Sequence, residues 1–265
     1  MFNLQSSMFN VQRSIFNVQR SMIKKHIPNT ITCLNLISGC IATMWAFDGN
    51  YRMALLFIVI GAVFDFFDGM SARLLHVSSP IGKELDSLAD VITFGFAPSA
   101  MIFNYLSKLC VVIDFTLFTF DTVIPFLAFI MAAFSALRLA KFNLDERQSM
   151  GFIGLPTPAN ALFWGSLVVS MYDYTPELVT LSYTERLAFS PLILLIIFGV
   201  LISSYLLIAE IPMFALKFKT WGWKGNEVKY IFLLTCIPLF LLFGFAAIIA
   251  WYVILSLIVN FKKSK

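Results

Sequence analysis

The stretch DFFDGMSARLLHVSSPIGKELDSLAD, residues 65–90, places four aspartates within an otherwise apolar polypeptide. Asp65 and Asp68 are three residues apart, and Asp86 and Asp90 are four apart. On helices, each pair would therefore project from one face. Two such faces turned toward each other would enclose a cage of carboxylate oxygens, which are the ligands that hard divalent cations prefer. The stretch predicts two helices that meet around a metal site.

The amino-acid composition indicates that these helices lie in a lipid bilayer. Of the 265 residues, 59% are hydrophobic and 13% are charged, and the mean hydropathy is +0.84. Apolar runs long enough to cross ~30 Å of hydrocarbon recur along the chain. We therefore predict an all-α, polytopic integral membrane protein. Each carboxylate in a bilayer costs on the order of 2.5–3.5 kcal/mol on insertion scales, so four together require compensation by cations or substrate.

Seven apolar runs are candidates for membrane helices. The first six suit single crossings and cover residues 28–47, 51–75, 84–106, 122–140, 152–171 and 187–208. The last run, residues 230–260, would reach about 45 Å as one straight helix, and Pro238 and Gly244 interrupt it. We expect a kinked hairpin there. The predicted architecture is a six-helix core plus a C-terminal hairpin, with about eight transmembrane helices.

Basic residues indicate the orientation, because loops rich in Lys and Arg stay in the cytoplasm. Lys229 and Lys262 flank the last run on both sides, which an even number of crossings explains. We expect a multi-pass protein of the cell membrane with both termini and the active site facing the cytoplasm. The net charge of +4 then reflects topology and anionic headgroups, and gives no case for nucleic acid. The predicted cytoplasmic group is Lys24, Lys25, Arg73, Lys83, Arg138, Lys141, Arg147, Lys217, Lys219, Lys224, Lys229, Lys262, Lys263 and Lys265, and the opposite group is Arg52, Lys108 and Arg186.

The first 21 residues are three near copies of one heptapeptide, MFNLQSS, MFNVQRS and IFNVQRS. Three units are short for a coiled coil, and they lack the continuous apolar core of a cleavable signal. We expect residues 1–21 to be a disordered or interfacial extension that activity does not require. Residues 22–265 are expected to form the membrane domain.

Clustered acids alone would also suit a transporter that relays protons or ions. The neighbours of the aspartates favour an enzyme. Gly69, Ala72 and Gly82 are small enough to let helix backbones approach or to admit a flat ring, and Arg73 offers a planar fork suited to phosphate. Two metal ions about 3.5–4 Å apart would stabilise the attacking and leaving oxygens of a displacement at phosphorus.

These positions resemble the signature of the CDP-alcohol phosphotransferases, which comprises Asp65, Asp68, Gly69, Ala72, Arg73, Gly82, Asp86 and Asp90. The resemblance implies a six-helix core, usually in a homodimer, that transfers a phosphoryl-linked group from a CDP-activated donor to an alcohol and releases CMP. It implies that Asp65, Asp68 and Asp86 bind one metal ion, Mg²⁺ or Mn²⁺. Asp90 would complete a second metal site and take the proton of the acceptor hydroxyl. The remaining four residues would border the CDP moiety.

Four further stretches look like the members of this family that use CDP-diacylglycerol and L-serine. They are IPNTITCLNLISG (27–39), GKELDSLADVITFGFAPS (82–99), SALRLAKFN (135–143) and GFIGLPTPANA (151–161). The resemblance implies a phosphatidyltransferase of phospholipid biosynthesis with serine as its acceptor. A sister enzyme that uses glycerol phosphate or inositol phosphate would keep the same signature, so the acceptor remains open at this point.

Four other residues are candidates for the substrate pockets. Asn29 and Thr32 could line the donor pocket, although helix capping explains Asn29 equally well. Arg138 lies in an apolar run near its predicted cytoplasmic end, where it could hold the carboxylate of serine or the lipid phosphate. An arginine that snorkels to the interface is the alternative. Thr93, just past Asp90, is a candidate for shaping the acceptor pocket.

Overall fold

Eleven helical elements and two very short strands make up the described part of the chain. The computed structural model describes residues 2–77, 79–113, 123–144, 152–180, 182–213, 222 and 226–263; it describes the backbone alone at 2–11, 13–25, 152–153, 174–179, 212, 241–245 and 260–263. The elements are α1 (Phe2–Phe47), α2 (Tyr51–Leu74), α3 (Pro80–Asp90), the π-helix η1 (Val91–Phe96), α4 (Ala97–Ile113), the 3₁₀ helix η2 (Ile124–Ala128), α5 (Phe129–Leu144), β1 (Phe152–Ile153), α6 (Thr157–Thr180), α7 (Tyr183–Leu187), α8 (Ser190–Ile208), β2 (Pro212–Met213) and α9 (Glu227–Lys263).

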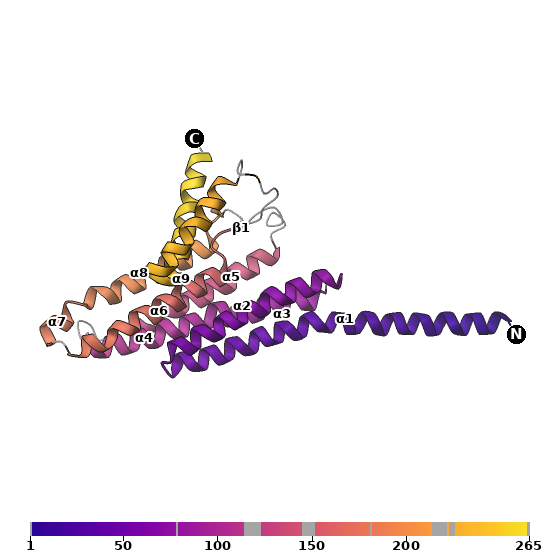
Figure 1. Cartoon of the computed structure of the whole chain (residues 1–265). Coiled ribbons are helices and arrows are strands. Elements are labelled where there is room, and N and C mark those ends of the chain that lie inside the picture. The colour runs from indigo at the N-terminus through magenta and orange to yellow at the C-terminus, as the bar shows by residue number, and fades with distance from the viewer. Residues whose placement is uncertain are drawn as a thin grey trace.

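The long helices lie side by side in one bundle (Figure 1). Five segments of the described chain are long and apolar enough to cross a membrane: His26–Phe47, Tyr51–Leu74, Pro80–Ile113, Ile124–Leu144 and Tyr183–Ile208. The 24-residue helix α6 occupies the place of the predicted fifth span. The prediction of an all-α, polytopic membrane protein is therefore confirmed.

The start of the fifth span differs from the prediction. Residues 152–153 form β1, which pairs antiparallel with β2, and α6 begins at Thr157 instead of Phe152. Gly154 has a φ of +76°, and Pro156 disfavours the helical conformation of the residue before it. The two-residue ladder therefore ties the entry of α6 to the segment that follows α8.

The third span is one continuous run from Pro80 to Ile113, in which α3, η1 and α4 follow each other without a gap. The Ser79 hydroxyl caps its start by accepting a hydrogen bond from the backbone N–H of Gly82, and Pro80 occupies the first turn. The π-helical turn was not predicted. It begins directly after Asp90, and π-turns inserted in longer helices are frequent at functional sites.

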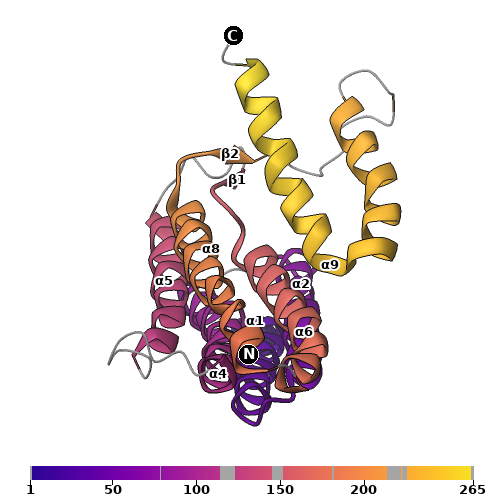
Figure 2. The ribbon, with the colours of Figure 1, turned by 90° about the vertical axis from the view of Figure 1, so that its left-hand side faces the viewer.

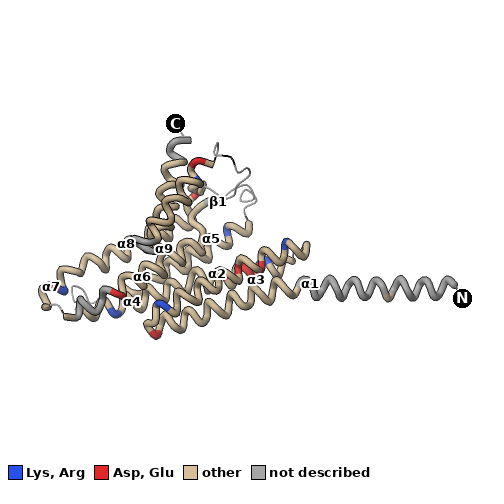
Figure 3. The backbone as a smooth tube through the Cα atoms, in the orientation of Figure 1, with Lys and Arg blue, Asp and Glu red and all other residues tan. Residues whose placement is uncertain are grey.

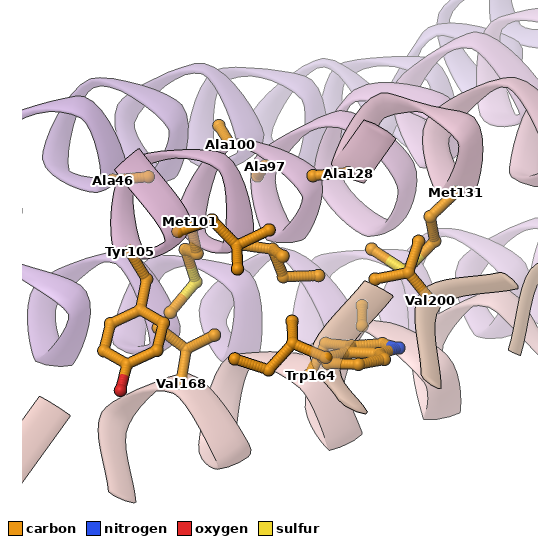
Figure 4. Close-up of a cluster of buried hydrophobic side chains, with 14 of the residues drawn as sticks. Ala46, Ala97, Ala100, Met101, Tyr105, Ala128, Met131, Trp164, Val168 and Val200 are labelled. Atoms are coloured by element: carbon orange, nitrogen blue, oxygen red, sulfur yellow. The ribbon is translucent and has the colours of Figure 1, made fainter. Parts of the chain in front are cut away.

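The apolar core surrounds α4, which packs against α1 and α6 (Figure 4). Ala46, Ala97 and Ala100 are fully buried small residues that let neighbouring helix backbones approach. Met101 of α4 lies against Gly165 of α6, and the almost completely buried Trp164 of α6 lies against Gly199 of α8. This packed middle holds the helices in a fixed register and so determines which polar side chains meet at the end of the bundle.

Helix α9 folds back on itself, as predicted for residues 230–260 (Figure 2). The indole Nε1 of Trp251 donates to Thr235 Oγ1 over 2.9 Å, and the rings of Phe232 and Tyr252 lie 5.9 Å apart. Residues 16 positions apart would be about 24 Å apart along a straight helix. These contacts confirm the hairpin, which contains Pro238 in its first half.

Helix α1 starts at Phe2, so the backbone of residues 2–21 is helical. The expectation was a disordered or interfacial extension, and a helical backbone is compatible with the interfacial alternative. The three heptapeptides contain neither Gly nor Pro, so adding them to an established helix avoids the cost of a new nucleus. That residues 22–265 form the functional domain by themselves stays a prediction.

Candidate active site

Three aspartates come together where the C-terminal half of α2 meets α3 (Figure 3). Asp65, Asp68 and Asp86 can each offer one carboxylate oxygen, and these oxygens lie within 4.8 Å of one another. Asp65 and Asp68 share a face of α2, and Asp86 faces them from α3. The predicted meeting of two acidic helix faces is thus present in the structure.

Helix α1 supplies polar partners for two of the four aspartates. The Thr32 hydroxyl donates to Asp68 Oδ2 over 2.6 Å, and the Asn35 amide donates to Asp90 Oδ1 over 3.1 Å. Thr32 and Asn35 are three residues apart and therefore share one face of α1. All four side chains are buried. Sequence reasoning missed Asn35 as the partner of Asp90, and its spacing from Thr32 was the available signal.

A cavity of about 210 Å³ opens beside the acidic cluster, between α1, α2 and α3. Its lining includes five of the residues predicted to border the donor: Asn29, Thr32, Gly69, Ala72 and Gly82. The other lining residues are Pro28, Asp68, Val77, Ser79, Lys83 and Asp86. Val77, Ser79 and Lys83 were not predicted, because their contribution depends on how the link between α2 and α3 folds over the cavity.

Two of the residues predicted to border the CDP moiety, Gly82 and Arg73, differ in their position relative to the cavity. A Cβ added to Gly82 would lie 2.9 Å from Asn29 Oδ1 and 3.0 Å from Ser79 Oγ, so this position has little room for a side chain. Arg73 is not among the lining residues of the cavity. Its Nε donates to the backbone oxygen of Gly69 over 3.0 Å, which keeps the guanidinium beside the cavity rim.

The donor set fits a hard divalent cation. Three carboxylates face one another, and Asp86 Oδ1 is buried without a hydrogen-bond partner in the described part of the chain. A buried charged oxygen is costly unless a cation or donor compensates it. Oxygen ligands alone favour Mg²⁺, Ca²⁺ or Mn²⁺ over the softer metals. The acidic cluster could therefore hold a divalent metal.

Asp90 lies deeper in the bundle, at the junction of α3 and η1. It is 7% exposed, and its closest polar neighbour is the Asn35 amide. Asp90 is not one of the three aspartates of the compact cluster. It is nevertheless close enough to Asp65 and Asp86 for their charges to interact. Asp90 therefore lies beside the compact cluster, with its carboxylate held by the Asn35 amide.

Thr93 on η1 contacts both α1 and α2. Its hydroxyl donates to the backbone oxygen of Asn35 over 3.0 Å. A Cβ on Gly61 would lie 2.5 Å from Thr93 Cγ2, and a Cβ on Gly39 would overlap Thr93 Oγ1. Because the hydroxyl proton is engaged by α1, Thr93 can shape an acceptor pocket by fixing η1 beside Asp90.

Arg138 is buried on α5, where sequence reasoning had weighed a snorkelling side chain. It is 8% exposed, and its Nη1 lies 3.4 Å from Thr157 Oγ1 on α6. Its charge and that of Asp90 attract each other. The Nε of Arg138 has no hydrogen-bond partner among the described residues. A buried guanidinium with an available donor, near Asp90, suits an anionic group of a substrate.

The fold and the site define a class: a polytopic helical membrane protein that holds a carboxylate cage and an adjoining cavity at one end of its bundle. Residues 25–183 match the family of CDP-alcohol phosphatidyltransferases. The chain belongs to this family. The matched region contains the acidic cluster, the cavity and Arg138, whereas α8 and α9 follow it.

Several curated relatives bear the name CDP-diacylglycerol–serine O-phosphatidyltransferase. The protein of Bacillus subtilis is 36% identical over 156 residues, which cover 59% of this chain and 81% of that protein. The protein of Helicobacter pylori strain 26695 is 34% identical over 137 residues, covering 51% and 54% of the two chains. The protein of Saccharomyces cerevisiae is 39% identical over 149 residues, covering 50% of each. The chain thus spans about half the length of the latter two relatives.

Proposed function

We propose that this protein transfers the phosphatidyl group of CDP-diacylglycerol to the hydroxyl of L-serine and releases CMP, as a step of phospholipid biosynthesis. The observation that carries the proposal is the cavity lined by Asn29, Gly69, Ala72 and Gly82 directly beside the three clustered aspartates. The names of the relatives, from bacteria and yeast, support serine as the acceptor.

The donor fits the cavity between α1, α2 and α3. Gly82 lines this cavity without a side chain of its own, and Lys83 brings a positive charge to the lining. A divalent ion, Mg²⁺ or Mn²⁺, held by Asp65, Asp68 and Asp86, with Asp90 completing a second site, would supply charge that neutralises the diphosphate and the leaving CMP. Exposed apolar side chains of α2, such as Leu56, Val63 and Phe66, would face the acyl chains in the bilayer.

Asp90 is the residue that we assign as the general base. Asn35 occupies Asp90 Oδ1 and thereby orients the carboxylate, so that Oδ2 can receive the proton of the acceptor hydroxyl. The serine oxygen then bonds to the phosphatidyl phosphorus, the bond from phosphorus to the CMP oxygen breaks, and CMP leaves. Burial of Asp90 beside Asn35 and Thr93 keeps bulk water, a competing acceptor, away from this oxygen.

The same proposal includes the location, orientation and assembly of the enzyme. We assign it to the cell membrane with both termini and the active site on the cytoplasmic side, because serine and CMP are water-soluble and the basic residues concentrate at that end. A homodimer is the assembly expected from the family.

L-serine is expected to release CMP from CDP-diacylglycerol in the presence of the purified protein, detergent and divalent metal. Glycerol 3-phosphate, inositol phosphate and a sample without acceptor serve as parallel reactions. The expected rate with serine exceeds the others by about 10²-fold or more, since a site that binds the polar groups of one acceptor rejects others strongly. CMP release with a different alcohol would keep the reaction class and discard serine as the acceptor. If no acceptor led to CMP release, the alternative of an ion- or proton-relaying transporter would be favoured instead.

Removal of residues 1–21 is expected to leave the rate of CMP release within about twofold of the full chain, because the truncation touches none of the residues assigned to the site. The first of them is Asn29. The two proteins would be compared at equal concentration after size-exclusion chromatography in detergent. A truncated protein that elutes like the full chain but lacks activity would assign the heptapeptides a direct role.

A further inference from the structure

Unpartnered polar atoms concentrate where α5, α6 and α8 meet. The described chain has seven buried side-chain polar atoms without a hydrogen-bond partner, and four of them belong to Arg138, Asn160 and Ser204. Each of the three helices contributes one of these residues. The others lie in the site already described or, for Arg186, near α4. Together with Thr157, we call Arg138, Asn160 and Ser204 the α5–α6–α8 polar cluster.

Hydrogen bonds hold the three helices in register around this cluster. Arg138 on α5 lies 3.4 Å from Thr157 on α6, and Asn160 is three residues further along the same face of α6. The indole of Trp164, one turn beyond Asn160, donates to Ser203 on α8 over 2.9 Å. Figure 2 shows α8 between α5 and α6. Ser204, the neighbour of Ser203, is on the same turn of α8 and is 1% exposed.

Asn160 is the unusual member of the cluster. Its side chain is fully buried, yet its amide nitrogen and its amide oxygen both lack a hydrogen-bond partner within the described residues. Buried polar groups in native proteins are nearly always paired. An asparagine that lacks both partners is suited to a ligand that donates to Oδ1 and accepts from Nδ2. Arg138, which offers a further unpartnered donor, would favour a ligand with a negative group.

The cluster adjoins the proposed base. Helix α5 packs closely on η1, where a Cβ added to Gly95 would lie 3.0 Å from the side chain of Ser135. Arg138 is three residues after Ser135 on α5, and its charge interacts with that of Asp90. A small acceptor could therefore place its hydroxyl at Asp90 while its remaining polar groups reach the cluster.

We propose that Asn160 is a specificity-determining residue that, together with Arg138, binds the ammonium and carboxylate groups of the amino-acid acceptor. Arg138 pairs with the carboxylate, Asn160 Oδ1 accepts from the ammonium, and Asn160 Nδ2 donates to a carboxylate oxygen. Ser204 closes the cluster from α8, outside the residues matched by the family. The inference rests on the proposed function, because it takes the acceptor to be serine.

The test measures CMP release by the full chain against acceptor concentration, with L-serine, ethanolamine, which lacks the carboxylate, and 3-hydroxypropionate, which lacks the ammonium. Asn160→Leu is expected to raise the KM for serine by about 10- to 100-fold and to lose the preference for serine over 3-hydroxypropionate by a similar factor. The KM for CDP-diacylglycerol should stay within about twofold of the wild type, since Asn160 does not line the cavity proposed for the donor.

Stability separates a binding role from a structural one. Leucine has the same number and branching of side-chain heavy atoms as asparagine and has no polar atom to leave unpaired, so Asn160→Leu should unfold at a temperature no lower than the wild type without serine. Asn160→Asp retains an oxygen for the ammonium and should keep part of the preference over 3-hydroxypropionate. Ser166→Ala is the matched control on α6, because the Ser166 hydroxyl bonds only to its own helix in the described structure, and its serine KM should not change.

A serine KM for Asn160→Leu within about twofold of the wild type would overturn the inference. A lower unfolding temperature with unchanged acceptor preference would also overturn it, and would assign Asn160 to an ordered water or to packing. Failure of the proposed function is a different result, because the wild-type protein itself would then release no CMP with serine.

Discussion

Replacement of Asp90 by asparagine is expected to leave nucleotide binding intact and to reduce the rate of CMP release by about 10²- to 10⁴-fold, the usual contribution of a general acid or base. The side chain keeps its size, and the Asn35 amide can still bond to an oxygen at this position. The lost element is the carboxylate oxygen that receives the serine proton. The loss should therefore appear in kcat, with little change in the KM for CDP-diacylglycerol.

The measurement pairs steady-state CMP release with binding of CMP to the same preparation. Asn35→Leu provides a graded comparison: it removes the hydrogen bond that orients Asp90 but keeps the carboxylate, so its loss should be smaller. Turnover by Asp90→Asn close to that of the wild type would remove Asp90 from the role of base.

The second large effect is expected for Asp86→Asn, which should lower CMP release by about 10³-fold, because the metal contributes several kcal/mol of charge stabilisation to the transition state. EDTA should produce a similar loss in the wild type, and added Mg²⁺ or Mn²⁺ should reverse it. In the variant, higher metal concentrations should restore activity only in part, because one of three clustered carboxylates is neutral.

Asp173→Asn is the matched control for Asp86→Asn. Asp173 forms a 3.0 Å ion pair with Arg52, and both side chains are solvent-exposed, 45% and 74% respectively. Exposed pairs contribute about 0–1 kcal/mol, so this variant should keep its activity and its response to EDTA. Full activity of Asp86→Asn in the presence of EDTA would contradict the assignment of the acidic cluster as the metal site.

Local sequence patterns predicted the presence of the helices more accurately than the residues at which they begin and end. Apolar runs located the five described segments that are long and apolar enough to cross a membrane, since a bilayer demands about 20 apolar residues of any helix that spans it. The start of the fifth span was misplaced by five residues, because Gly154 and Pro156 turn the chain before α6 begins. The π-turn after Asp90 carries no local signal in its residues, VITFGF.

The composition of the site was also predictable, but its hydrogen bonds were not. Spacing within α2 and within α3 placed the aspartates of each helix on a common face. Nothing in that spacing could select Thr32 as the partner of Asp68, or Asn35 as the partner of Asp90. Those pairs join residues 36 and 55 positions apart, and depend on how far α1 slides along its neighbours.

The sequence by itself therefore determined that this protein lies in a membrane, that its crossings are helical and that its site is built from carboxylates. These properties follow from residue type and helical period, which act over a few neighbouring positions. The tertiary structure alone decided the pairing of Thr32 with Asp68 and of Asn35 with Asp90, the part of the cavity lining that Val77, Ser79 and Lys83 supply, and the contact of Arg138 with Thr157. Contacts between distant segments depend on close packing of the whole bundle, which local periodicity does not encode.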